Sequence, residues 1–139
     1  MRYLLLLLVL MAGCTQVSPV YKQDINTAYL QLLHNKERGQ RDLPQLQYDK
    51  ELEAFAQKWA EHMASRGSLR HSNLGFSGNM KGENIAMGQQ DEDAVTKAWM
   101  SSRGHRANIL NGKFTHAGFG CARTERGTLY WCACFCSRS

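Results

Sequence analysis

Several classes of protein are disfavoured by what the sequence lacks. No hydrophobic run is long enough to cross a bilayer: the run over residues 4–11 has eight residues, whereas a membrane-spanning helix needs about 20. The net charge of +5 comes from scattered residues rather than a dense basic stripe, so a nucleic-acid-binding surface is not expected. The chain also lacks internal repeats, a His-Glu-x-x-His pair and a Gly-x-Ser-x-Gly elbow, which are the signatures of two hydrolase classes.

The N-terminus has the pattern of a secretory signal. The apolar run over residues 4–11 follows one cation, Arg2, and two small residues precede Cys14, as a signal peptidase requires. Residues 10–14 resemble a bacterial lipobox, in which the cysteine becomes the lipidated first residue of the mature protein. We expect a lipoprotein-type signal peptide over residues 1–13, a lipidated Cys14 with a tether over residues 14–23, and one domain over residues 24–139.

The membrane interpretation has one alternative, which is an ordinary secretory signal with a chance cysteine. If Cys14 is lipidated, its acyl chains anchor the domain to a membrane without spanning it. Thr15, rather than an acidic residue, follows the cysteine, and in enterobacterial lipoproteins this points to the outer membrane. The expected location is therefore the bacterial cell envelope, as an outer-membrane lipoprotein facing the periplasm or the surface.

Apolar periodicity predicts three helices in the first three quarters of the domain. The first starts at an N-cap Asp24 and stops at Gly39, and the second runs from an N-cap Asp49 to Gly67. The third starts at Asp91 or Asp93 and ends near Ser102, before a turn over residues 105–110. Glycines between the second and third helices favour loop and short extended pieces.

A β-hairpin is predicted at the C-terminus, with strands over residues 117–124 and 128–135 on either side of residues 125–127. Helices followed by a closing hairpin are typical of an α+β layered domain. Symmetric pairing about residues 126 and 127 places Cys121 opposite Cys132, a separation that suits a disulfide.

Cys132, Cys134 and Cys136 are expected on one face of the second strand, about 6.6 Å apart from neighbour to neighbour. This leaves Cys134 and Cys136 either free or paired beyond the end of the strand. A thiolate metal site is a weaker alternative, because three ligands on one extended strand diverge.

Polar groups that could share one pocket come from three separate segments. They are His71, Glu83 within residues 82–86, and His105 within residues 105–110. Two imidazoles and a carboxylate can share a proton or hold a divalent ion. The function of the chain is expected to lie there.

The order of these segments resembles that of bacterial CAP domains, which are related to cysteine-rich secretory proteins, venom antigens and plant pathogenesis-related proteins. The matching elements, which cover residues 25–135, are residues 33–38, Trp59-Ala60, His71, residues 82–86, Trp99, residues 105–110, residues 118–120 and Tyr130-Trp131. The resemblance implies a three-layer α-β-α sandwich of CAP type. It also implies a cleft lined by two histidines and two glutamates, of which His71, Glu83 and His105 match three. The fourth position is Ser102 here.

Three interpretations of the cleft remain open. The first is a binding module in which His71 and His105 hold Zn²⁺ and Glu83 positions a water molecule or an imidazole. The ligand of this module would be a lipid or a cell-wall glycan. Mg²⁺ is less suitable because it prefers oxygen ligands. The second is a hydrolase of peptide or cell-wall substrates, either metal-assisted or with Glu83 as base; a triad of Ser102, His105 and Glu83 is a minor variant. The third is a structural role in which the polar groups satisfy one another. No residue pattern indicates an oligomeric state.

Overall fold

The computed structural model describes residues 19–139. The signal peptide predicted over residues 1–13 and the predicted lipidation site, Cys14, lie outside this part of the chain. No helix in the described part is both long enough and apolar enough to span a membrane. The elements, in chain order, are β1 (Val20–Lys22), α1 (Thr27–Gly39), β2 (Gln47–Tyr48), α2 (Lys50–Arg66), β3 (Lys81–Met87), α3 (Glu92–Met100), α4 (Arg103–Ile109), β4 (His116–Thr124) and β5 (Leu129–Cys136).

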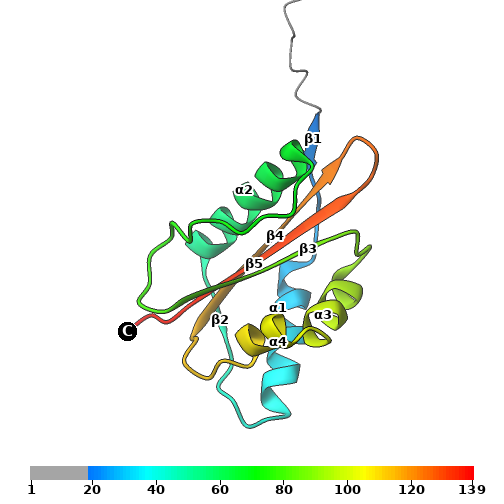
Figure 1. Cartoon of the computed structure of the whole chain (residues 1–139). Coiled ribbons are helices and arrows are strands. Elements are labelled where there is room, and N and C mark those ends of the chain that lie inside the picture. The colour runs from blue at the N-terminus through cyan, green and yellow to red at the C-terminus, as the bar shows by residue number, and fades with distance from the viewer. Residues whose placement is uncertain (1–18) are drawn as a thin grey trace, which may run out of the picture.

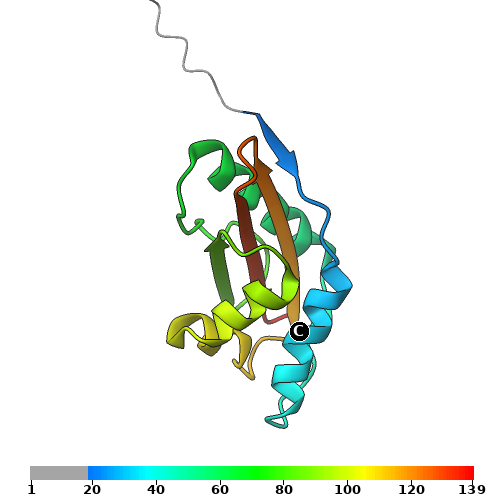
Figure 2. The ribbon, with the colours of Figure 1, turned by 90° about the vertical axis from the view of Figure 1, so that its right-hand side faces the viewer.

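The strands form one sheet in the order β1-β4-β5-β3, and β2 also pairs with β4. Strands β4 and β5 make the C-terminal hairpin, and β3 pairs antiparallel with the far edge of β5. Helix α2 covers one face of the sheet, and α1, α3 and α4 cover the other (Figures 1 and 2). The predicted α+β fold, a three-layer α-β-α sandwich with a C-terminal hairpin, is confirmed.

Both faces of the sheet are buried, so successive residues of a strand contribute in turn to two different cores. On the side of α1, α3 and α4, the strands contribute Phe119, Trp131 and Phe135, which pack with Trp99. On the α2 side, the cluster contains Leu52, Ala56, Ala60, Met63, Ile85, Tyr130, Cys132 and Cys134. Every residue of β5 is buried, which explains why this strand reads as a continuous apolar run.

Helix α2 rests directly on the backbone of β4. A Cβ atom added at Gly118 would overlap the backbone nitrogen of Glu53, and one added at Gly120 would overlap the backbone of Gln57. Both are helix backbone atoms, which cannot move aside as a flexible side chain can. The two glycines therefore set how closely α2 approaches the sheet.

The helix caps follow the sequence signals closely, with one shift. Asp49 caps α2 by accepting a hydrogen bond from Leu52 N, and Gly67 ends the helix in the left-handed conformation with φ 59°, as predicted. Asp91 likewise caps α3. Helix α1 is capped by Asn26, whose side chain accepts from Tyr29 N, and not by Asp24.

Two segments predicted to be irregular form regular secondary structure. Val20–Lys22, which was predicted to belong to the tether, forms the edge strand β1 and pairs with residues 122–124 of β4. The folded domain therefore begins before residue 24. The segment expected to be a turn over residues 105–110 falls largely within helix α4, which spans Arg103–Ile109. Both elements are too short for periodicity to reveal them, and they are stabilised by tertiary contacts.

The predicted disulfide between Cys121 and Cys132 is wrong. Strands β4 and β5 join through a three-residue loop over residues 125–127, with Thr124 N donating to Thr128 O at 3.0 Å and Gly127 at φ 87°. This loop is one residue longer than the symmetric pairing assumed, so Cys121 lies opposite Trp131 and Cys132 lies opposite Gly120. A shift of one residue reverses the face of the sheet: Cys121 packs on the α1 side and Cys132 on the α2 side.

Helix α1 contributes two buried polar side chains to the core. The guanidinium of Arg38 donates to the carbonyl oxygens of Pro44, Ile109, Asn111 and Phe114 at 2.8–3.1 Å. It thereby fixes the end of α4 against α1. His34 is fully buried, its Nδ1 donates to Leu30 O at 2.8 Å, and its ring lies 4.8 Å from that of Phe119 between centroids. Burial lowers the pKa of His34 to about 4.

We predict that Gly120→Ala destabilises the domain by about 3 kcal/mol or more, because the added methyl group forces α2 away from the sheet. Gly39→Ala is the matched control, since nothing lies within 4 Å of the Cβ position at Gly39; it should be neutral or slightly stabilising. Urea unfolding of both variants measures the difference. Equal stability of Gly120→Ala and wild type would show that α2 does not pack on the β4 backbone.

We also predict that His34 makes folding sensitive to acid. The folded-state pKa of about 4 lies below the value of about 6.5 in an unfolded chain, so the stabilisation is complete above about pH 6.5 and is lost as pH falls toward 4. Between about pH 7 and pH 5, the wild type should lose about 2 kcal/mol more unfolding free energy than His34→Gln. Urea unfolding at both pH values tests this, and parallel losses in the two proteins would contradict it.

Candidate functional site

The side chains of His71 and Glu83 form the centre of the site. His71 lies in the segment that follows α2, and its Nδ1 is 2.7 Å from Glu83 Oε1. The same carboxylate oxygen accepts from the backbone N–H of Ser72 at 2.9 Å. The Glu83 side chain is 2% exposed and that of His71 is 61% exposed. A buried carboxylate therefore holds an imidazole whose opposite edge faces solvent.

Strand β3 positions Glu83 at the rim of the sheet. Among the strands of residues 19–139, β3 pairs with β5 alone. Glu83 lies opposite Cys134 and Ile85 lies opposite Cys132, which places the Glu83 side chain on the α2 face. The segment carrying His71 and Ser72 closes over it there.

Two asparagines attach α4 to the opposite face of the same strand. Asn84 Nδ2 donates to His105 O at 2.9 Å. Asn108 Nδ2 donates to Asn84 Oδ1 at 2.9 Å and to Glu83 O at 3.1 Å. Asn84 is fully buried, and its amide is satisfied by α4. These bonds fix His105 relative to β3.

His105 is partly buried on α4, and His71 lies near its side chain. Partial burial lowers the pKa of His105, and the nearby His71 lowers it further. Both effects favour a neutral imidazole, which is the form that binds metal ions. No hydrogen bond to a ring nitrogen of His105 is found within residues 19–139.

Ser102 is the residue that precedes α4, at its N-cap position, but its side chain makes no capping hydrogen bond. Within the described residues, no hydrogen bond joins Ser102 to His105, and Glu83 is bonded to His71 instead. The three residues of the triad alternative are thus not linked as a serine nucleophile requires.

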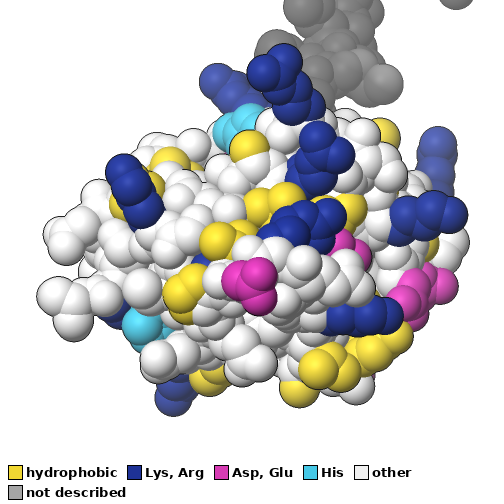
Figure 3. All heavy atoms as spheres, turned by 90° about the horizontal axis from the view of Figure 1, so that it is seen from below, with side chains coloured by type: hydrophobic (Ala, Val, Ile, Leu, Met, Phe, Trp, Pro, Cys, Tyr) yellow, Lys and Arg dark blue, Asp and Glu magenta, His cyan; other side chains and the backbone are white. Residues whose placement is uncertain are grey.

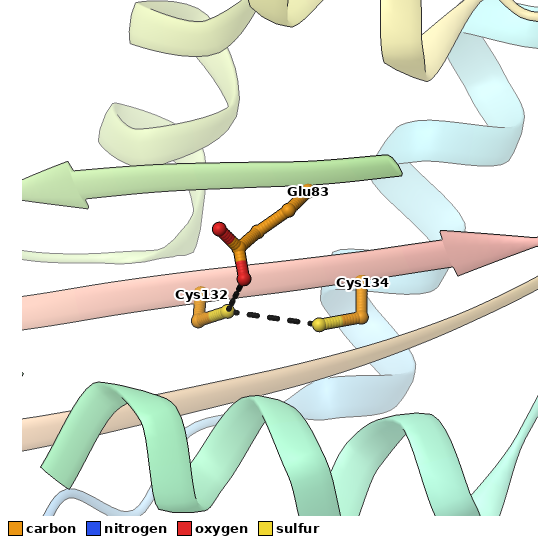
Figure 4. A group of neighbouring side chains, drawn as sticks. All are labelled: Glu83, Cys132 and Cys134. Atoms are coloured by element: carbon orange, nitrogen blue, oxygen red, sulfur yellow. Dashed lines mark hydrogen bonds between the residues drawn. The ribbon is translucent and has the colours of Figure 1, made fainter. Parts of the chain in front are cut away.

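Two thiols beneath Glu83 were not expected to belong to the site. Cys132 Sγ lies 3.9 Å from Glu83 Oε2 and 3.7 Å from Cys134 Sγ (Figure 4). Burial raises the pKa of Cys132 well above its usual value, and the neighbouring Cys134 and Glu83 raise it further. The spacing of alternate residues suggested diverging sulfurs, but the two side chains lean toward each other. The signal that could have revealed them is the Cys-Ala-Cys alternation of β5, read in register with Glu83.

On the face shown in Figure 3, Lys and Arg side chains are scattered among uncharged groups and a few Asp and Glu side chains. This agrees with the scattered cations of the sequence. It offers no continuous basic track for a phosphate backbone.

The donor set at His71 suits a metal ion. In zinc sites a ligating histidine commonly donates its other ring N–H to a carboxylate, which fixes the tautomer; the bond from His71 Nδ1 to Glu83 has this form. This leaves Nε2 of the largely exposed His71 ring as the free ligand atom. Within residues 19–139, however, neither histidine belongs to a set of three ligand atoms that all lie within 4.8 Å of one another. An ion held by these imidazoles would have to complete its coordination with other ligands, such as water.

Comparison with known proteins decides the family. The sequence profile of CAP, the cysteine-rich secretory protein family, matches residues 32–135. The chain belongs to this family. The matched region contains His71, Glu83, Ser102 and His105, so the whole candidate site lies inside the family's domain.

Relatives of this CAP domain occur in several organisms. YkwD of Bacillus subtilis is 39% identical over 110 residues, which are 70% of this chain and 42% of YkwD; the chain thus spans less than half the length of that relative. An outer surface protein of Borrelia burgdorferi has the same fold, with a TM-score of 0.77 at 21% identity over 87% of this chain and 100% of the Borrelia chain. So has NaASP2, solved with Zn²⁺, with a TM-score of 0.62 at 17% identity over 78% of this chain and 77% of that one.

Proposed function

We propose that this CAP domain is an extracytoplasmic binding module, tethered to a membrane through a lipidated Cys14. His71 and His105 hold a divalent metal ion, Zn²⁺, and the ligand is a lipid or a cell-wall glycan. One observation carries the metal proposal: a buried carboxylate, Glu83, binds Nδ1 of His71 at 2.7 Å while the other edge of the ring remains exposed. Glu83 accordingly acts as an orienting group for His71.

The chemistry of the donor set supports Zn²⁺ over Mg²⁺. Neutral imidazole is a good ligand for zinc, whereas Mg²⁺ prefers carboxylate, carbonyl and water oxygens. The related fold of NaASP2 has been solved with Zn²⁺. Zn²⁺ held by two imidazoles would supply a Lewis-acid centre with positions open to oxygen atoms of a ligand.

Two features favour binding over hydrolysis. The Glu83 side chain is only 2% exposed, and Oε1 already accepts hydrogen bonds from His71 and Ser72. Such a carboxylate is badly placed to take a proton from a water molecule in the cleft. Ser102, which stands where the family's second glutamate is usual, supplies no second carboxylate at that position.

The tether proposal combines the lipobox pattern with the start of the fold. Strand β1 begins at Val20, so only residues 15–19 separate Cys14 from the folded domain. A segment this short would keep the domain beside the membrane. The Borrelia protein with the same fold is an outer surface protein, in keeping with an exposed location.

We predict that Zn²⁺ binding depends on the two histidines. By calorimetry, His71→Ala plus His105→Ala should bind one equivalent of Zn²⁺ fewer than the wild type. The ion at this site should stabilise the wild type by about 2.7 kcal/mol at a free concentration 100 times the dissociation constant. The control is His62→Ala plus His116→Ala, which removes the same number of imidazoles elsewhere. Equal stoichiometry in the wild type and the His71/His105 variant would refute the histidine site.

We predict that Cys14 carries the membrane anchor. When the full chain is expressed in a bacterium supplied with labelled fatty acid, the label should enter the wild type and Cys121→Ser but not Cys14→Ser. Cys121 is a fully buried thiol, so its variant controls for the loss of a cysteine as such. Absence of label from the wild type would indicate an ordinary secretory signal.

A further inference from the structure

The α2 face of the sheet contains a polar group where apolar packing is expected. Glu83, Cys132 and Cys134 each contribute a ligand atom, and these three atoms all lie within 4.8 Å of one another. All three residues are buried, with exposed fractions of 5%, 1% and 0%. Figure 4 shows the Glu83 carboxylate of β3 directed at the sulfur of Cys132, which lies beside the sulfur of Cys134 on the same face of β5.

Two of the three distances among these atoms match the edges of a zinc tetrahedron. With Zn–S bonds of about 2.3 Å and Zn–O bonds of about 2.1 Å, tetrahedral angles place two sulfurs about 3.8 Å apart and a sulfur and an oxygen about 3.6 Å apart. The observed Sγ–Sγ distance is 3.7 Å, and Cys132 Sγ lies 3.9 Å from Glu83 Oε2. The third distance, between Cys134 Sγ and the Glu83 carboxylate, is at most 4.8 Å, so the three atoms would have to close slightly around an ion.

The charge balance also permits a buried ion here. Binding releases one proton from each thiol and forms two Zn–S bonds, so Zn²⁺ replaces two protons and the net charge of the site is unchanged. The carboxylate is already present and is bonded through its other oxygen to His71. No further charge has to be brought into the interior.

Cys121, in the same hairpin, is a thiol that only fills space in an apolar core. It is fully buried on the opposite face, among apolar residues, and no cluster of potential ligands in the described part of the chain includes it. Cys132 and Cys134, by contrast, share their pocket with a carboxylate. All four cysteines of the described residues are free thiols.

From these observations we propose a second metal site, in which Glu83 Oε2, Cys132 Sγ and Cys134 Sγ bind Zn²⁺. Thiolate ligands select soft or borderline ions such as Zn²⁺ over Mg²⁺ or Ca²⁺. This site goes beyond the proposed histidine site and does not depend on it, although the two share Glu83: one carboxylate oxygen orients His71 and the other faces the thiols. The metal would tie β3 to β5 beneath the cleft.

Cobalt provides the test, because Co²⁺ takes zinc sites and Co²⁺–thiolate bonds absorb in the near ultraviolet. Reduced, metal-free full-length protein is titrated with Co²⁺ alone. One equivalent should produce thiolate charge-transfer absorption in the wild type, in Cys121→Ser and in His71→Ala plus His105→Ala. The absorption should be lost in Cys132→Ser and in Cys134→Ser, and added Zn²⁺ should displace it in the wild type.

A measurement on the wild type alone guards against misfolded variants. Zn²⁺ should protect Cys132 and Cys134, but not Cys121, from alkylation in partly denaturing urea, as read by peptide mass spectrometry.

The proposal is overturned if the wild type shows no thiolate absorption, if either Cys132→Ser or Cys134→Ser retains it, or if Cys132 and Cys134 are found joined as a disulfide. Loss of the absorption in the double histidine variant would also overturn it as a separate site. Failure of the histidine site alone would leave the cobalt result unchanged.

Discussion

The register between β4 and β5 is the constraint on which the rest of the structure depends. Both faces of the sheet are buried, so each strand residue has only one acceptable side, and a slip of one residue would exchange the two cores. The three-residue loop ending at Gly127 sets this register. It directs Gly118 and Gly120 toward α2, where only glycine allows the helix to pack on the strand.

The same register builds the candidate site. Because β5 is fixed against β4, β3 can place Glu83 opposite Cys134 on the α2 face and Asn84 on the other. Glu83 then reaches His71, while Asn84 holds the backbone of His105 on α4. The edge strand β3 thus bonds to segments on both sides of the sheet. Because its successive side chains point to opposite faces, Glu83 contacts the α2 side and Asn84 contacts α4.

The features with a local physical cause were predictable from the sequence. The cap at Asp49 and the left-handed stop at Gly67 depend on neighbouring residues alone, as does the presence of the hairpin. The polar segments and the family resemblance both placed His71 and Glu83 in one pocket, and the structure adds the hydrogen bond between them. The register was not predictable, because the same turn sequence fits a two-residue or a three-residue loop. The two loops shift the partner of every β4 residue by one position, and assuming the shorter loop placed Cys121 opposite Cys132. Nor was the approach of the sulfurs of Cys132 and Cys134, which depends on side-chain torsions.

The central claim is that Glu83 faces two ways, toward the imidazole of His71 and toward the thiols of Cys132 and Cys134. Anomalous diffraction from a crystal of the protein soaked in Zn²⁺ tests it most directly. The account predicts one anomalous peak beside His71 and His105 and a second among Glu83, Cys132 and Cys134. A Glu83 carboxylate turned away from both groups, with no zinc peak near either, would contradict it.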